Sequence, residues 1–127
     1  MGYDVELVQV SPPAGLSFPV EPDAAKRLLA QVVRFADDQA VRAALLAVAG
    51  CKPGPGDSVD YVGERLSYAR FSVLADRVHV ENNCSARELL KVHEELSKTL
   101  PNLCILDLQS GRLHDAASFA AWWARPL

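Results

Sequence analysis

The sequence lacks the features that mark several broad classes of protein. No run of apolar residues approaches the ~20 that a membrane-spanning helix needs, and the N-terminus has neither the basic nor the apolar region of a secretory signal peptide. The three cysteines form no C-x-x-C pair and no even disulfide set, which is typical of a reducing compartment. We therefore expect a cytoplasmic protein with no membrane partner.

Signatures of nucleotide and nucleic-acid binding are missing as well. The run Pro53-Gly-Pro-Gly56 is not followed by the Lys-Ser/Thr of a phosphate loop, and its prolines remove N–H groups that a phosphate would use. Basic residues are not interleaved with aromatics, and 13 basic against 16 acidic residues leave a net charge of −3. This charge argues against a nucleic-acid partner and mildly favours a basic or neutral one.

The chain has enough apolar residues for one hydrophobic core. Half of its 127 residues are hydrophobic, and this length suits one domain rather than two, so residues 1–127 are expected to form a single domain. Residues 3–10 alternate between apolar and polar, which predicts a first strand. Pro22 then suits the first turn of a helix whose apolar stripe reaches Phe35.

The helical pattern continues to Ala49 with a changed phase, which predicts two helices or one bent helix. Asp37 or Asp38 can cap the second piece by accepting hydrogen bonds from its free N–H groups. The segment 51–56 is rich in proline and glycine, and we expect no regular element there. Residues 57–82 have the alternation of two or three antiparallel strands, with a turn at Asp76 and Arg77.

A capping box marks the next helix. Ser85 and Glu88 have the spacing in which each side chain binds a backbone N–H of the other, so a helix is predicted over residues 86–100, before Pro101. A core strand over residues 103–108 and a short C-terminal helix follow. The predicted fold is α/β (α+β): a two-layer sandwich, a ferredoxin-like βαββαβ variant with an extra helical piece, room for an added strand and a short C-terminal helix. Both helices that separate strands are expected on one face of a mixed sheet.

Two groups of residues could carry chemistry, and each has a plain alternative. His79 and Glu81 share one face of a predicted strand, and with Cys84 they offer three metal-ligand types at uneven spacing; the alternative is an ordinary polar strand face. Cys84 also precedes a helix N-terminus, where the partial positive charge lowers a thiol pKa; the alternative is a small buried filler. We expect neither reading to make an enzyme, and we assign no catalytic residue, no metal and no cofactor.

Other ionisable residues are expected to be structural. His93 lies on the apolar face of the capped helix and is predicted to be a satisfied core histidine. Asp57, Asp60 and Glu64 are expected to line a solvated strand edge, which discourages strand pairing. Cys104 lies inside an apolar strand and is expected in the core.

The C-terminal segment combines a polar loop with two tryptophans. One indole is expected to close the core, while the other either packs on a loop or forms an exposed anchor of the kind enriched at protein interfaces. The predicted partner-binding residues are Gln109, Arg112, His114, Asp115, Trp122 and Trp123.

The stretch Leu106–Asp115 is an apolar strand followed by D-x-Q-[ST]-G, and a small helix comes next. It resembles the C-terminal portion of small cytoplasmic immunity proteins that accompany bacterial secreted or polymorphic toxins. The resemblance implies a protein that blocks one cognate toxin by direct binding, with no chemistry of its own. Two alternatives stay open: a small-molecule-binding regulatory module, which can be a homodimer, and a small thiol- or metal-dependent enzyme.

Overall fold

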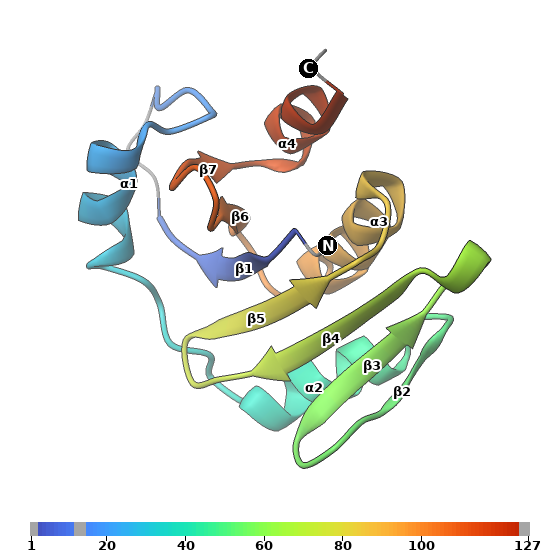
Figure 1. Ribbon diagram of the computed structural model, residues 1–127. Coiled ribbons are helices and arrows are strands. Elements are labelled where there is room, and N and C mark those ends of the chain that lie inside the picture. The colour runs from blue at the N-terminus through green and yellow to red at the C-terminus, as the bar shows by residue number, and fades with distance from the viewer. Residues whose placement is uncertain (1–2, 12–14, 125–127) are drawn as a thin grey trace.

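A twisted antiparallel sheet forms the centre of the molecule in the computed structural model, which describes residues 3–11 and 15–124 (Figure 1). Its seven strands have the order β2-β3-β4-β5-β1-β6-β7, and every described pairing is antiparallel, so the expectation of a mixed sheet is wrong. The strands are β1 (Val5–Gln9), β2 (Cys51–Pro53), β3 (Ser58–Val62), β4 (Tyr68–Val73), β5 (Arg77–Asn82), β6 (Leu103–Asp107) and β7 (Leu113–His114).

Three of the four helices cover one face of this sheet. The helices are α1 (Pro22–Leu29), α2 (Asp38–Leu46), α3 (Ala86–Ser97) and α4 (Ala116–Ala124), and a short 3-10 helix spans Glu64–Leu66. One core cluster joins α2, α3 and α4 to the sheet; its largest fully buried members are Leu7, Leu45, Phe71, Leu89, Leu96, Ile105 and Phe119. No helix in the described part of the chain is long and apolar enough to cross a membrane.

The first helix lies on the opposite face. Ala25 of α1 is buried in a second, smaller cluster with Val8, Cys104 and Leu106, which project from the other side of β1 and β6. The apolar residues of β1 and β6 therefore fill both faces, and the second face needs a cover of its own. The expectation that all helices between strands share one face holds for α2 and α3 and is wrong for α1.

Local sequence signals explain where the helices begin. Asp37 accepts hydrogen bonds from the backbone N–H groups of Gln39 (3.0 Å) and Ala40 (3.3 Å), so it caps α2 as predicted. The capping box between Ser85 and Glu88 is confirmed at the start of α3. These bonds satisfy N–H groups that have no partner inside the first turn.

The chain between α1 and α2 is not helical, although its apolar spacing continues. The N–H of Val33 donates to Gln9 O (2.9 Å), and the N–H of Phe35 donates to Ala75 O (2.9 Å). These N–H groups bind carbonyls at the ends of strands instead of carbonyls one turn back. The segment therefore passes from one face of the sheet to the other and leaves two separate helices.

Two short strands were not expected from the sequence. Residues 51–53 pair with β3 as the edge strand β2, so the expectation of no regular element there is wrong. An edge strand tolerates Pro53 because one of its sides needs no ladder hydrogen bonds. β7 pairs with β6, and the β4–β5 turn spans residues 74–76, so it includes the predicted Asp76 but not Arg77, which is the first residue of β5.

Candidate protein-docking site

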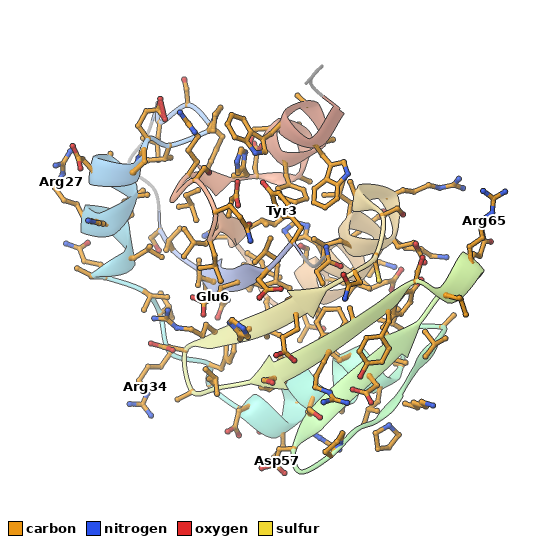
Figure 2. The ribbon with its side chains drawn as sticks, viewed as in Figure 1. Tyr3, Glu6, Arg27, Arg34, Asp57 and Arg65 are labelled. Atoms are coloured by element: carbon orange, nitrogen blue, oxygen red, sulfur yellow. The ribbon has the colours of Figure 1, made fainter. Side chains whose placement is uncertain are left out.

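A buried carboxylate at the end of β6 organises the C-terminal loop. Asp107 has no exposed surface, yet its Oδ2 accepts hydrogen bonds from the hydroxyls of Tyr3 (2.6 Å) and Ser110 (2.8 Å). Its Oδ1 accepts from the backbone N–H of Gln109 (3.0 Å). Figure 2 shows Tyr3 in the middle of the molecule, below α4. A buried charge that accepts several hydrogen bonds in this way links the first strand to the last loop.

Gln109, a predicted contact residue, anchors the same loop. With its amide nitrogen facing Asp107, the side chain donates to Asp107 Oδ1 (2.8 Å) and to the backbone oxygen of Asp4 (3.1 Å), and its oxygen accepts from the N–H of Asp4 (3.1 Å). The residue is exposed, but its amide is used within the protein. Its role is therefore to fasten the loop to Asp4, the residue directly before β1.

The rest of the loop is a closed turn. The N–H of Gly111 donates to Asp107 O (2.8 Å), and the N–H of Asp107 donates to Arg112 O (2.9 Å). Gly111 has a φ of 78°, a conformation that glycine adopts at little cost, which explains why a glycine occupies this position of the turn. Asp115 then caps α4, because its Oδ1 accepts from the N–H of Ser118 (2.8 Å). Asp115 thus has a structural task as well.

His114 lies beneath the predicted surface. Its side chain has no exposed area, and its Nδ1 is 2.9 Å from the hydroxyl of Ser118. Burial lowers the pKa of His114 below its usual value of 6.5, so the ring is neutral at pH 7. Its Nε2 has no hydrogen-bond partner among the residues that the structure describes. His114 supports the rings of Phe119 and Trp122, 5.6 Å and 5.8 Å away between centroids, and does not reach the surface.

Arg112 and Trp122 form a stacked pair that is half-exposed. The Arg112 guanidinium lies 4.7 Å from the centroid of the Trp122 ring, and its Nε donates to Glu21 Oε2 (2.7 Å). The indole N–H of Trp122 donates to the hydroxyl of Tyr3 (3.0 Å), which itself donates to Asp107. Both side chains are therefore held from two sides.

Trp123 faces the other side of α4. Its ring lies 4.5 Å from that of Tyr3 and 5.5 Å from that of Phe119 between centroids. It is Phe119, with no exposed area, that closes the core, while both indoles are half-buried. Arg112, Trp122 and Trp123 thus keep accessible surface, and we call these three residues the indole surface.

Each indole borders a separate hollow. The groove between α3 and α4 has a volume of about 900 Å³ and is lined by Ala86, Arg87, Leu90, Lys91, His93, Glu94, Ser97, Ala116, Ala120 and Trp123. A smaller hollow of about 330 Å³, the Trp122 notch, is lined by Phe18, Pro19, Ser118, Ala121 and Trp122. Ala120 and Ala121 are exposed neighbours on α4, one facing each hollow.

The candidate metal-ligand trio does not come together. Val78 and Val80 of β5 belong to the core under α3, so His79 and Glu81 project from the opposite face, whereas Cys84 is buried in that core. His79 Nδ1 is instead 3.0 Å from Glu6 Oε2. Within residues 3–11 and 15–124 no group of three or more His, Cys, Asp or Glu side chains is placed to hold a metal.

Cys84 is not activated by the helix that follows it. Burial, with a smaller contribution from the Glu88 carboxylate, raises the pKa of Cys84 to about 12. The expectation of a lowered thiol pKa is therefore wrong, because loss of hydration outweighs the helix end. The alternative is the better description: Cys84 is a small buried side chain that fills space in the core.

The remaining ionisable candidates are structural. His93 is buried and its Nε2 is 2.7 Å from Leu103 O, as expected for a satisfied core histidine. Cys104 is buried in the second core cluster, also as predicted. Asp60 is not a solvated edge residue: it is 8 % exposed and paired with Arg70 (2.8 Å), whose hydrogen bonds lower the pKa of the carboxyl.

Two members of the site were not predicted, Tyr3 and Asp107. The loop sequence carries a signal for Asp107, since an Asp before Ser and Gly commonly accepts from nearby N–H groups in a turn. Tyr3 carries none, because its partner lies 104 residues away in the chain.

The sequence matches no known protein-family model, and no curated protein or solved structure is significantly similar to it. The function is therefore argued from the site itself.

Proposed function

We propose that this protein is an inhibitor that neutralises a cognate bacterial toxin by direct binding, in the manner of a cytoplasmic immunity protein. The observation that carries the proposal is the Arg112–Trp122 stack, held at 4.7 Å on a closed loop beside a hollow. Tryptophan and arginine are among the residues most enriched at interface hot spots. Trp123 extends this surface across α4.

The rigidity of the indole surface supports a role in protein binding. Asp107 holds the loop through Tyr3, Ser110 and Gln109, and Asp115 caps the helix that bears both indoles. A surface that is ordered before association loses less conformational entropy when a partner binds. Gln109, His114 and Asp115 then act by positioning the indole surface, while Arg112, Trp122 and Trp123 make the contacts.

The strand order supports a ferredoxin-like scaffold for this surface. The four strands β6-β1-β5-β4 follow the antiparallel order of a βαββαβ fold, with α2 and α3 as its two helices on one face. β2 and β3 extend one edge of the sheet and β7 the other, and α1 is the additional helix. On this assignment, the three residues of the indole surface lie outside the four strands and two helices of the ferredoxin-like core.

Affinity capture followed by a growth assay tests the function. The tagged protein is used to isolate a stoichiometric partner from the native host, and the partner is then expressed in a laboratory bacterium with and without this protein. We expect the partner alone to arrest growth and co-expression to restore it. A partner that never arrests growth, or repeated capture of none, would contradict the proposal.

A matched pair of variants locates the contact. Ala120 and Ala121 are both exposed on α4, so Ala120→Glu and Ala121→Glu should fold equally well. Ala121→Glu obstructs the Trp122 notch and Ala120→Glu the groove beside Trp123. If Ala121→Glu loses growth rescue and Ala120→Glu keeps it, the contact lies on the notch side. If both variants keep growth rescue, neither hollow is part of the interface.

The groove between α3 and α4 supports one alternative function, a small-molecule-binding module. Its volume of about 900 Å³ lies within the range of ligand pockets, and Leu90, Ala116, Ala120 and Trp123 give it an apolar lining. Thermal-shift screening with amino acids and nucleotides separates the two functions, since only the alternative predicts stabilisation by a metabolite. Ala120→Glu is the control that should abolish such stabilisation.

A further inference from the structure

The Arg112 guanidinium has one edge in use and one edge available. Its Nε binds Glu21, and its plane rests on Trp122, but its two terminal NH₂ groups donate to no residue in the described chain. The Arg112 side chain as a whole is 30 % exposed, and its terminal NH₂ groups are the part of the guanidinium that makes no hydrogen bond within the described chain. Two parallel N–H donors in a fixed plane match the two oxygens of a carboxylate.

The neighbouring Trp122 notch favours an apolar group. Phe18, Pro19 and Ala121 contribute apolar walls, and the Trp122 ring contributes a flat aromatic side. Two lining residues have polar side-chain groups, and both groups are used within the protein: the Ser118 hydroxyl is 2.9 Å from His114 Nδ1, and the indole N–H of Trp122 donates to Tyr3. An apolar side chain of a partner can therefore enter the notch of about 330 Å³ without leaving either group unpaired.

From this pairing of features we infer that the Trp122 notch binds a segment of the partner protein in which an apolar side chain lies next to an Asp or Glu. The apolar side chain enters the notch, and the carboxylate accepts two hydrogen bonds from the terminal NH₂ groups of Arg112. This inference rests on the proposed function and names the chemistry that the partner must present.

The carboxylate comes from a side chain rather than from a chain terminus. Sites that capture a terminal carboxylate commonly use several free backbone N–H groups. Pro19 has no N–H, and the N–H of Ser118 is already bound to Asp115. Apart from N–H groups inside α4, the residues lining the notch offer only the N–H of Phe18 besides Arg112, and one backbone N–H is fewer than such sites use, which suits an internal acidic residue.

Glu21 does not prevent this contact. Its carboxylate occupies the Nε edge of Arg112, and its side chain is 67 % exposed, so water screens its repulsion of a second carboxylate. It also fixes the rotation of the guanidinium, so the free edge is presented in one orientation. A single local acidic contact is compatible with a partner that is basic elsewhere.

A random peptide library displayed on phage tests the inference directly. The library is panned on the immobilised wild-type protein, and the enriched peptide is synthesised with an amidated C-terminus. We expect an apolar residue adjacent to Asp or Glu in the enriched peptides. Binding should weaken about tenfold or more when that acid is changed to its amide or when Arg112→Gln is used.

Arg65→Gln is the matched control, because Arg65 is exposed, lies in the β3–β4 connection on the opposite side of the molecule from α1 (Figure 2), and does not line the notch. It should leave peptide affinity unchanged. Enrichment of peptides without an acid, no enrichment at all, or equal affinity for Arg112→Gln and wild type would overturn the inference. A peptide that binds only with a free C-terminal carboxylate would also overturn it.

The same variants separate this inference from the proposed function. If a captured toxin is still neutralised by Arg112→Gln, the function stands and the carboxylate contact is wrong. If acidic peptides bind through Arg112 but no toxin is neutralised, the contact stands and the inhibitor function is wrong.

Discussion

Replacing the buried Asp107 tests how the docking loop is held. Asp107→Ala removes the acceptor for four donors: the hydroxyls of Tyr3 and Ser110, and the backbone N–H and side-chain NH₂ of Gln109. Each buried donor left unpaired costs about 1–3 kcal/mol, and the two hydroxyls regain part of this by rotating toward other acceptors. We therefore expect Asp107→Ala to lower the free energy of unfolding by about 3–5 kcal/mol.

Asp107→Asn should be milder for a geometric reason. The amide keeps a carbonyl oxygen for the N–H of Gln109, and its NH₂ group takes the place of Oδ2, where the hydroxyls of Tyr3 and Ser110 can rotate to accept. The expected loss is about 1–2 kcal/mol, since the stronger bonds to a charged acceptor become neutral ones. Asp57→Ala, at an exposed carboxylate, is the control and should change stability by less than about 0.5 kcal/mol.

Urea unfolding followed by tryptophan fluorescence measures these differences at the site itself, because both tryptophans of the chain lie on α4. Circular dichroism of the same samples checks that loop and core unfold together, and equal m-values show that the denatured states are comparable. A loss below about 1 kcal/mol for Asp107→Ala, or equal losses for Ala and Asn, would refute the hydrogen-bond argument.

Three further predictions follow from the buried residues. Burial lowers the pKa of His114 in the folded state, so below pH 6.5 the unfolded chain binds more protons than the folded chain. The free energy of unfolding should therefore fall as the pH drops from 6.5 toward the folded-state pKa, by at most about 1.4 kcal/mol per pH unit. His114→Phe should reduce this slope in thermal unfolding at several pH values, and an unchanged slope would exclude His114 as its cause. Cys84, whose pKa is about 12, should react with a thiol reagent at neutral pH only after urea is added; fast labelling of Cys84 in a variant lacking Cys51 and Cys104 would contradict this. Phe119→Ala should lower the free energy of unfolding by about 3–5 kcal/mol in urea titrations, and a loss under 1 kcal/mol would show that the helix closes no core there.

Elements governed by nearby residues were predictable from the sequence. The capping box at Ser85 and Glu88 and the cap at Asp37 involve partners within three residues, so their geometry is encoded locally. The strands between residues 57 and 82 were predictable because one face of them is buried and the other is polar. The prediction of His93 as a core histidine is confirmed for the same reason, since the apolar stripe places it.

Elements that depend on distant backbone were missed. β2 exists because residues 51–53 find a free edge on β3, and β7 exists because β6 offers an edge to residues 113 and 114. The end of α1 is set by carbonyls of Gln9 and Ala75, which compete with the helix for N–H groups. Local propensity cannot show which edges and carbonyls the fold will bring near.

The sequence by itself determined that the C-terminal loop and helix would combine polar residues with two indoles. Only the tertiary structure decided which of those residues face outward. Gln109, His114 and Asp115 turn inward or cap α4, because Tyr3 and Asp4 of the first segment lie against the loop and offer hydrogen bonds and ring contacts. Arg112 and the two tryptophans are half-buried, so described parts of the chain cover part of each side chain and leave the rest accessible. This packing of distant segments is information that residue type and spacing do not contain.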